Sequence, residues 1–430
     1  MGTTPAPQLN DGDISWVLCS SALVLAMTAP GLALFYGGMV RRKNVNSILM
    51  QCFMCLAIVS VLWVVIGYSL AFGPGHGWIG QFVGGLDWFM LHNVSMYQPE
   101  HWSPDPKWDP TTSYGSTVPN QVYMIFQCMF AVITPALVIG SFAERVKFSA
   151  WVWFTVIWLL VVYCPVAHMV WSHDGIENHW GVLDFAGGTV VHMNAGIAGL
   201  ATALYLGKRI GTDKQGMHNV PFVMIGASLL WFGWFGFNAG SAGAANGRAA
   251  MAMTVTMVAA AMAALSWMTV EWRIKGKPSV LGTITGAISG LVAITPASGY
   301  VDTVGALIIG ALGGAICFMS ASFIKEKFHL IDDSLDCFGI HGIGGILGAI
   351  LTGVFAKASI SGTTSQSGAI DGNPGQILIQ LQGIGWTIGW CALATLVILF
   401  IVDRTIGLRV PEAVERDGLD VALHGETLQR

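Results

Sequence analysis

Long stretches without a charged side chain constrain this sequence more than any other feature. The stretch from Asn44 to Leu86 contains no lysine, arginine, aspartate or glutamate, and an apolar run of about 20 residues can cross the hydrocarbon core of a membrane as a helix. Charged residues make up 10% of the chain, against about 25% in a soluble domain. The sequence therefore predicts an all-α polytopic membrane protein and excludes a water-soluble enzyme. A net charge of −4 without a basic patch also excludes nucleic-acid binding.

Polar and charged clusters divide the apolar sequence into eleven segments, each expected to form a transmembrane helix. They span residues 14–36, 46–72, 118–142, 149–171, 186–206, 219–240, 248–270, 279–297, 303–324, 337–356 and 377–402. Residues 1–402 are thus expected to form a membrane domain. Residues 403–430 form a polar, mixed-charge tail whose composition alone is typical of disorder. An odd number of spans places the two termini on opposite sides of the membrane.

The lysines and arginines lie almost entirely on one side of this topology. Of the 20 in the chain, all but Lys107, Arg248 and Lys357 follow odd-numbered segments. Loops rich in these residues stay in the cytoplasm, so we expect the N-terminus outside and the C-terminus in the cytoplasm. The segment from Gly73 to Thr117 is then a long external loop, able to reshape the outer surface or contact a neighbour.

A short motif occurs twice, in the fifth and the tenth segments. Residues 192–199 and 341–348 both fit H-x-x-x-G-I-x-G, and an acidic residue precedes each, Asp184 and Asp336. The two segments cross the membrane in opposite directions. The pattern therefore predicts two inverted five-helix halves, about 14–206 and 219–356, followed by the last span 377–402. In such proteins the site lies at the interface of the halves near the midplane.

The two histidines of this motif are the strongest candidates for function. His192 lies eight residues after Asp184, about 12 Å along a helix, which places it near the centre of the membrane. Ionisable groups at that depth usually serve a function. Desolvation favours the neutral ring, so His192 and His341 are expected to line a path with alternating donors and acceptors. The alternatives are two packing histidines bonded to carbonyls, or a metal site, which no further ligand at that depth supports.

Two further groups of residues are candidates with weaker support. Phe126 and Phe130 share a helix face, and Trp171 and the run from Trp234 to Ser241 end spans on the outer side. Aromatic faces attract cations by about 0.5–2 kcal/mol, but tryptophans at span ends are equally expected of the interfacial belt. Asp184 and Asp336 begin spans, and we interpret both as helix N-caps rather than as ligands of an ion.

The stretch from Asp184 through His192 to Arg209 resembles the signature of the ammonium transporter (Amt/Mep/Rh) family, most of all its bacterial channels. The resemblance runs from Gly31–Gly38 to the tail, and it implies a homotrimer with one pore per subunit and no cofactor. By resemblance, ammonium is recruited by Trp171, Phe130, Ser241 and Asp184. The phenylalanine gate is Phe130 and Phe237, and the pore holds His192, His341 and, near its inner side, Gln127.

The resemblance also implies partners and a location. The tail from Gly407 to Glu426 is similar to the regulatory tail with which bacterial members bind a trimeric PII signalling protein at the cytoplasmic face. Ammonium, ammonia and methylammonium are the expected substrates, and the inner (plasma) membrane the expected location. Three alternatives remain open. They are an ammonium sensor, which usually adds a signalling domain after the last span, a carbon dioxide channel, and an intramembrane metalloenzyme.

Overall fold

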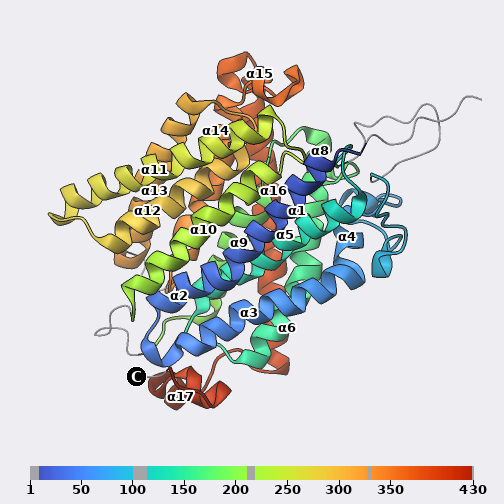
Figure 1. The fold of residues 1–430 in the computed structure, drawn as a ribbon. Coiled ribbons are helices and arrows are strands. Elements are labelled where there is room, and N and C mark those ends of the chain that lie inside the picture. Colours follow the sequence, from blue (N-terminus) through green and yellow to red (C-terminus); the bar gives the residue numbers. More distant parts are fainter. Residues whose placement is uncertain (1–8, 100–113, 211–217, 328–330, 429–430) are drawn as a thin grey trace, which may run out of the picture.

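The computed structural model describes residues 9–99, 114–210, 218–327 and 331–428, and this part of the chain is almost entirely helical (Figure 1). Eleven of its helical segments are long and apolar enough to cross a membrane, which confirms the predicted number. They are Asp11–Met39, Arg42–Phe72, Asn120–Phe142, Phe148–Trp180, Gly188–Leu206, Val220–Gly240, Gly247–Lys275, Val280–Ala297, Thr303–Phe323, Phe338–Phe355 and Gly375–Thr405. Lys107, Lys214 and Arg430, which entered the prediction of orientation, lie outside the described residues, as does part of the predicted loop 73–117.

Several spans consist of two α-helices joined by a wider π-helical turn. Pro30, which has no N–H to donate, lies in the turn Met27–Leu32 that joins α1 to α2. The α-helices are α1 (Asp11–Ala26), α2 (Ala33–Met39), α3 (Val45–Leu62), α4 (Tyr68–Phe72), α5 (Asn120–Phe142), α6 (Phe148–Trp158), α7 (Cys164–Trp171), α8 (Ile176–Trp180), α9 (Asn194–Leu206), α10 (Val220–Gly240), α11 (Gly247–Lys275), α12 (Val280–Ile294), α13 (Thr303–Lys327), α14 (Ile343–Phe355), α15 (Ala358–Ser361), α16 (Gly375–Thr405) and α17 (Glu412–Asp417). The helix α7 ends at Trp171, as the prediction for the fourth span has it, and extended backbone at Ser172 and Gly175 separates it from the short helix α8.

The two histidine segments pack against each other through glycine. A Cβ atom on Gly196 would lie 2.1 Å from the backbone nitrogen of Gly342, and one on Gly345 would lie 2.7 Å from the carbonyl oxygen of Gly188. Small residues allow membrane helices such a close approach. The close approach holds the π-helical turns Gly188–Met193 and Phe338–Gly342, which carry His192 and His341, side by side.

The C-terminal tail packs against one end of the bundle, whereas α8 and α15 lie at the other end (Figure 1). Asp420 accepts hydrogen bonds from the N–H groups of Asn46 and Ser47 at the start of α3, at 3.0 and 2.8 Å. The N–H of Leu419 donates to Asn44 at 2.8 Å. We call this end the tail face: the turns 40–44, 143–147, 207–210 and 331–337 with residues 406–428. The tail is ordered through residue 428, so the disorder typical of its composition is not observed.

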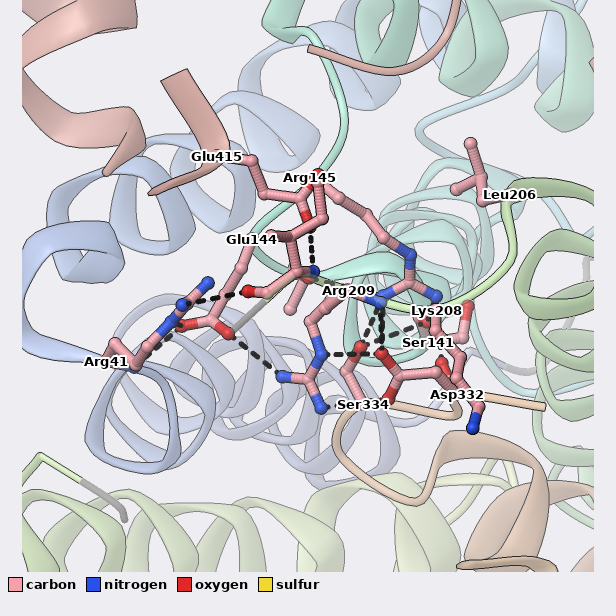
Figure 2. A network of polar contacts seen from close by, with 12 residues as sticks. Arg41, Ser141, Glu144, Arg145, Leu206, Lys208, Arg209, Asp332, Ser334 and Glu415 are labelled. Carbon is pink, nitrogen blue, oxygen red and sulfur yellow. Dashed lines mark hydrogen bonds and ion pairs between the residues drawn. The ribbon is translucent and has the colours of Figure 1, made fainter. Parts of the chain in front are cut away.

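A buried ionic network joins the turns of the tail face to the tail (Figure 2). Glu144 pairs with Arg41 at 3.0 Å and with Arg209 at 2.9 Å, and Arg209 also pairs with Asp332 at 2.8 Å. Glu415 of the tail accepts the N–H of Ile210 at 2.6 Å. Burial alone would raise the pKa of Glu144, but the guanidinium groups of Arg209 and Arg41 hold this pKa below its usual value.

This network gives the tail face a defined pH dependence. Because the native pKa of Glu144 is depressed, the folded protein binds this proton more weakly than the unfolded chain does. The stabilisation is present above about pH 4.5, the usual value, and is lost as the pH falls further. We expect the thermal stability of the detergent-solubilised protein to fall below that pH, and Glu144→Gln to lower it at pH 7 and flatten the curve. Parallel curves for the two proteins would contradict this account.

Candidate functional site

A cavity opens at the end of the bundle opposite the tail face. Its volume is about 360 Å³, and we call it the vestibule. Aromatic and polar side chains from several spans line it: Tyr114, Tyr123, Phe126, Gln127, Trp171, His173, Asp184, Phe185, Ser241, Arg248, Tyr300 and Gln366, with Val17, Val118, Gly240 and Gly243. The structure thus brings three of the predicted recruitment residues, Trp171, Ser241 and Asp184, to one hollow.

Trp171 and Ser241 have fixed positions on the wall of the vestibule. The indole Nε1 of Trp171 donates to the carbonyl oxygen of Asp184 at 2.9 Å, which holds the ring against Phe130. The hydroxyl of Ser241, just after α10, donates to the carbonyl oxygen of Phe237 at 2.8 Å. The lone pairs of the Ser241 oxygen are therefore left to accept from a ligand. An electron-rich indole face and a hydroxyl acceptor together suit a small cation that carries N–H groups.

A stack of phenylalanines lies next to Trp171. The rings of Phe130 and Trp171 meet edge to face, with centroids 5.8 Å apart. Phe130 stacks on Phe237 at 4.2 Å, the two rings 24° from parallel. Both phenylalanine side chains are fully buried. The two rings close the space between α5 and α10 beneath the vestibule.

The histidines lie directly beyond this stack. The ring of His192 is 5.8 Å from that of Phe237 and 5.3 Å from that of His341. The Nδ1 atoms of the two histidines are 3.3 Å apart, so one ring donates a hydrogen bond from its N–H to the nitrogen of the other. The Nε2 of His192 is buried without a protein partner among the described residues. This free ring nitrogen is available to a small polar molecule.

Trp234 and Phe126, which were candidates from the aromatic pattern but received no role from the family resemblance, belong to this arrangement. Trp234 stacks on His192 at 5.2 Å, and its indole donates to the hydroxyl of Thr295 at 2.9 Å. Phe126 packs edge to face on Phe130 at 5.0 Å and lines the vestibule. Their spacing gave a partial signal, because Phe126 and Phe130 lie four residues apart on one face, and Trp234 and Phe237 three.

Asp184 acts as a helix cap, as predicted. Its two carboxylate oxygens accept the N–H groups of the four residues 187–190, at 2.8, 2.7, 2.8 and 3.1 Å. These are the groups left unpaired at the start of the π-helical turn that carries His192. The carboxylate therefore positions the histidine segment, while its backbone oxygen holds the indole of Trp171.

The second cap differs from the prediction. The carboxylate that accepts the N–H groups of Cys337, Phe338 and Gly339 is that of Asp333, at 3.0, 2.7 and 3.3 Å, and not that of Asp336. Asp336 directly precedes the helix, but its left-handed φ of 60° differs from the extended backbone of an N-cap residue. Asp333 precedes His341 by eight residues, as Asp184 precedes His192. The two histidine segments thus have the same spacing between cap and histidine. The residue equivalent to Asp184 is Asp333, three residues before the predicted Asp336.

Gln127 also differs from its predicted place. It lines the vestibule, and its amide donates to the hydroxyl of Tyr123 at 2.8 Å. The helix α5 runs from the vestibule toward the tail face, so a residue one turn before Phe130 lies above the phenylalanine stack. The expectation that Gln127 lies near the inner side of the pore is therefore wrong.

Comparisons with known proteins agree with these observations. The model of the Ammonium Transporter Family matches residues 15–428. An ammonium transporter of Aquifex aeolicus is 46% identical over 97% of this chain and 93% of its own length, and one of Bacillus subtilis 45% over 96% and 98%. The crystal structure of Saccharomyces cerevisiae Mep2 superposes with a TM-score of 0.85 at 35% identity, covering 94% of this chain and 88% of that one. A structure described as a sensor Amt protein superposes with a TM-score of 0.84 at 26% identity, covering 96% and 98%.

Proposed function

Starting from the fact that this chain belongs to the ammonium transporter family, we propose that it captures ammonium as an ion in the vestibule and passes it across the membrane as ammonia. The chain is a multi-pass membrane protein that transports ammonium, and it is not an enzyme. The proposal concerns the route: recruitment by Trp171, Ser241 and the neighbouring Phe130, release of a proton, and passage of ammonia beyond the phenylalanine stack.

The observation that carries this proposal is an unbroken row of ring contacts from an open cavity to a buried histidine pair. The row runs Trp171, Phe130, Phe237, His192 and His341, with successive centroid distances of 5.8, 4.2, 5.8 and 5.3 Å. Of these five side chains, Trp171 is partly exposed to solvent and the other four are buried. A route this narrow and apolar, flanked at one end by a cation-binding surface, suits a molecule that sheds its charge on the way.

Energetics distinguish the two forms of the substrate along this row. An ammonium ion in the vestibule gains cation–π attraction from Trp171, worth about 0.5–2 kcal/mol. The same ion beyond the stacked rings would lose its hydration without a counter-charge, which costs far more than burying a neutral polar group. Ammonia avoids this cost and finds hydrogen-bonding nitrogens on His192 and His341. Phe130 and Phe237 would then act as a gate that opens by small ring rotations.

The tail face and the vestibule support a proposed orientation. We propose that the vestibule faces outward and the tail face the cytoplasm, because Arg41, Arg145 and Arg209 all lie on the tail face and such residues favour the cytoplasm. The matched caps Asp184 and Asp333 support two inverted halves.

By family resemblance, we further propose a homotrimer in the inner membrane and a PII-type protein that binds at the tail face and blocks the pore.

Replacing Trp171 by leucine tests recruitment in the vestibule. Leucine keeps apolar bulk but removes the cation–π face and the hydrogen bond to Asp184. We expect the KM for methylammonium uptake into proteoliposomes to rise about two- to thirtyfold, corresponding to about 0.5–2 kcal/mol, with a smaller change in maximal rate. Trp153 of α6, which is half-exposed and not part of the vestibule wall, offers a matched control as Trp153→Leu. An unchanged KM in Trp171→Leu would contradict recruitment at this ring.

A further inference from the structure

We infer that Arg248 is a specificity-determining residue: its fixed positive charge on the vestibule wall limits the capture of cations. The inference rests on the proposed recruitment of ammonium as an ion in this cavity and goes beyond it. Among the described residues that line the vestibule, Arg248 is the only lysine or arginine, and it shares this wall with Trp171 and Ser241. A permanent cation at the entrance of a route for a cation calls for a physical explanation.

Contacts on three sides fix the guanidinium of Arg248. Its Nε donates to the carbonyl oxygen of Gly299 at 2.8 Å. Its central carbon lies 4.8 Å from the ring centroid of Phe185 and 4.9 Å from that of Tyr300. The side chain is half-buried. The charge is therefore held in place against the cavity wall and does not extend freely into solvent.

The position of Arg248 is not explained by helix stability. It is the second residue of α11 (Gly247–Lys275), where the helix dipole and unpaired N–H groups disfavour a positive charge. Asn246 already caps this helix by accepting the N–H of Ala249 at 3.0 Å. An arginine in this first turn thus works against the local electrostatics of its own helix, and both of its aromatic contacts, Phe185 and Tyr300, belong to the vestibule wall.

The charge of Arg248 is not cancelled by the carboxylate that shares the cavity. Asp184 also lines the vestibule, but both of its oxygens are engaged by four backbone N–H groups of residues 187–190. The positive ends of these N–H dipoles offset part of the field of the carboxylate, so a cation entering the cavity meets a field of Arg248 that Asp184 compensates only in part. The guanidinium also covers Phe185 and Tyr300, two aromatic faces that would otherwise attract a cation.

Two consequences follow for the ions that enter. Every permanent cation, such as potassium, is repelled for as long as it stays in the vestibule. Ammonium is repelled too, but it can give its proton to water in the open vestibule and move on as ammonia, and a neighbouring like charge favours that neutral form. Arg248 thus weakens capture of all cations while it favours the one cation that can become neutral.

The test compares Arg248→Gln with Arg248→Lys in proteoliposomes, with methylammonium as the probe. Glutamine removes the charge, whereas lysine keeps it but loses the planar contact with Phe185 and Tyr300. At low ionic strength we expect the KM of Arg248→Gln to be about three- to tenfold below that of wild type, and the KM of Arg248→Lys to stay near wild type. The difference in KM between Arg248→Gln and wild type should nearly disappear at 1 M of an impermeant salt, where the Debye length is about 3 Å.

Equal shifts in the two variants, or an unchanged or higher KM in Arg248→Gln, would overturn the inference. If Arg248→Gln does not fold, the wild type decides: repulsion by Arg248 predicts that its KM falls as salt is added, and a constant or rising KM refutes the inference. Trp171→Leu separates the two proposals. If its KM is unchanged, recruitment in the vestibule fails; if its KM rises while Arg248→Gln stays like wild type, only the role of Arg248 fails.

Discussion

Replacing His192 by alanine is expected to lower methylammonium uptake by the reconstituted protein about ten- to a hundredfold. The substitution removes the ring that stacks between Phe237 and His341, and with it the partner of the His341 Nδ1 at 3.3 Å. An unpaired buried polar group costs about 1–3 kcal/mol, and about 1.4 kcal/mol corresponds to a tenfold change in rate. Ammonia also loses the free Nε2 of His192. Uptake of labelled methylammonium into liposomes measures the effect.

His168 provides the matched control for this experiment. It is another fully buried histidine, but its ring nitrogens lie 3.1 and 2.7 Å from the carbonyl oxygens of Ala71 and Gly80, where it ties α7 to the loop after α4. We expect His168→Gln to lower thermal stability while uptake per folded protein stays near wild type. Equal uptake by wild type and His192→Ala would refute a role of His192 in conduction and would favour the interpretation of His192 as a packing residue.

Replacing Asp184 by asparagine is expected to destabilise the protein by about 2–6 kcal/mol and to lower uptake. The amide oxygen can still accept two of the four N–H groups, but the amide nitrogen would face the other two. Two buried N–H groups are then left unpaired, at about 1–3 kcal/mol each. The turn Gly188–Met193 carries His192, so loss of its cap also displaces the histidine. Thermal unfolding in detergent and uptake into liposomes measure the two effects.

Asp333→Asn serves as the comparison for this variant, because Asp333 caps three N–H groups at the start of the other histidine segment. A loss of stability and of uptake of the same kind is expected. A substitution at Asp336, whose carboxylate does not cap that segment, should change both less. If Asp184→Asn were as stable as wild type, the four short hydrogen bonds would not position the His192 segment in the way proposed here.

The overall fold could be predicted well from the sequence because the membrane restricts the possibilities. A spanning segment must satisfy its own backbone hydrogen bonds, so a long charge-free run is a helix, and eleven such runs became eleven spans. The order of the tail could not be predicted from composition. It depends on partners such as Asn44 and Ile210, which lie far away in the sequence, and on a buried ionic network with no local pattern.

The candidate site was predicted in part. His192 and His341 stood out because polar residues are rare at that depth, and the structure places them side by side. Gln127 was misplaced because its position relative to Phe130 depends on the direction of α5. Asp333 was missed because Asp336, three residues later, also provides an acidic residue before the histidine motif. Which of the two caps the segment depends on the backbone conformation, which the sequence pattern does not contain. Arg248 counted only as an exception to the charge distribution, since its place in the vestibule depends on the packing of α11 against Phe185 and Tyr300.

The central claim is that the substrate enters as an ion and crosses as a neutral molecule. The most direct test measures methylammonium uptake and current in proteoliposomes at two pH values one unit apart, at a fixed total substrate concentration below KM, with protein-free vesicles subtracted. One pH unit changes the free amine about tenfold and the ion hardly at all. We expect protein-mediated uptake that follows the ion, and therefore hardly changes between the two pH values, with no potassium current. Uptake that rises about tenfold with the free amine, a potassium current, or no flux at all, as expected of a sensor, would contradict this claim.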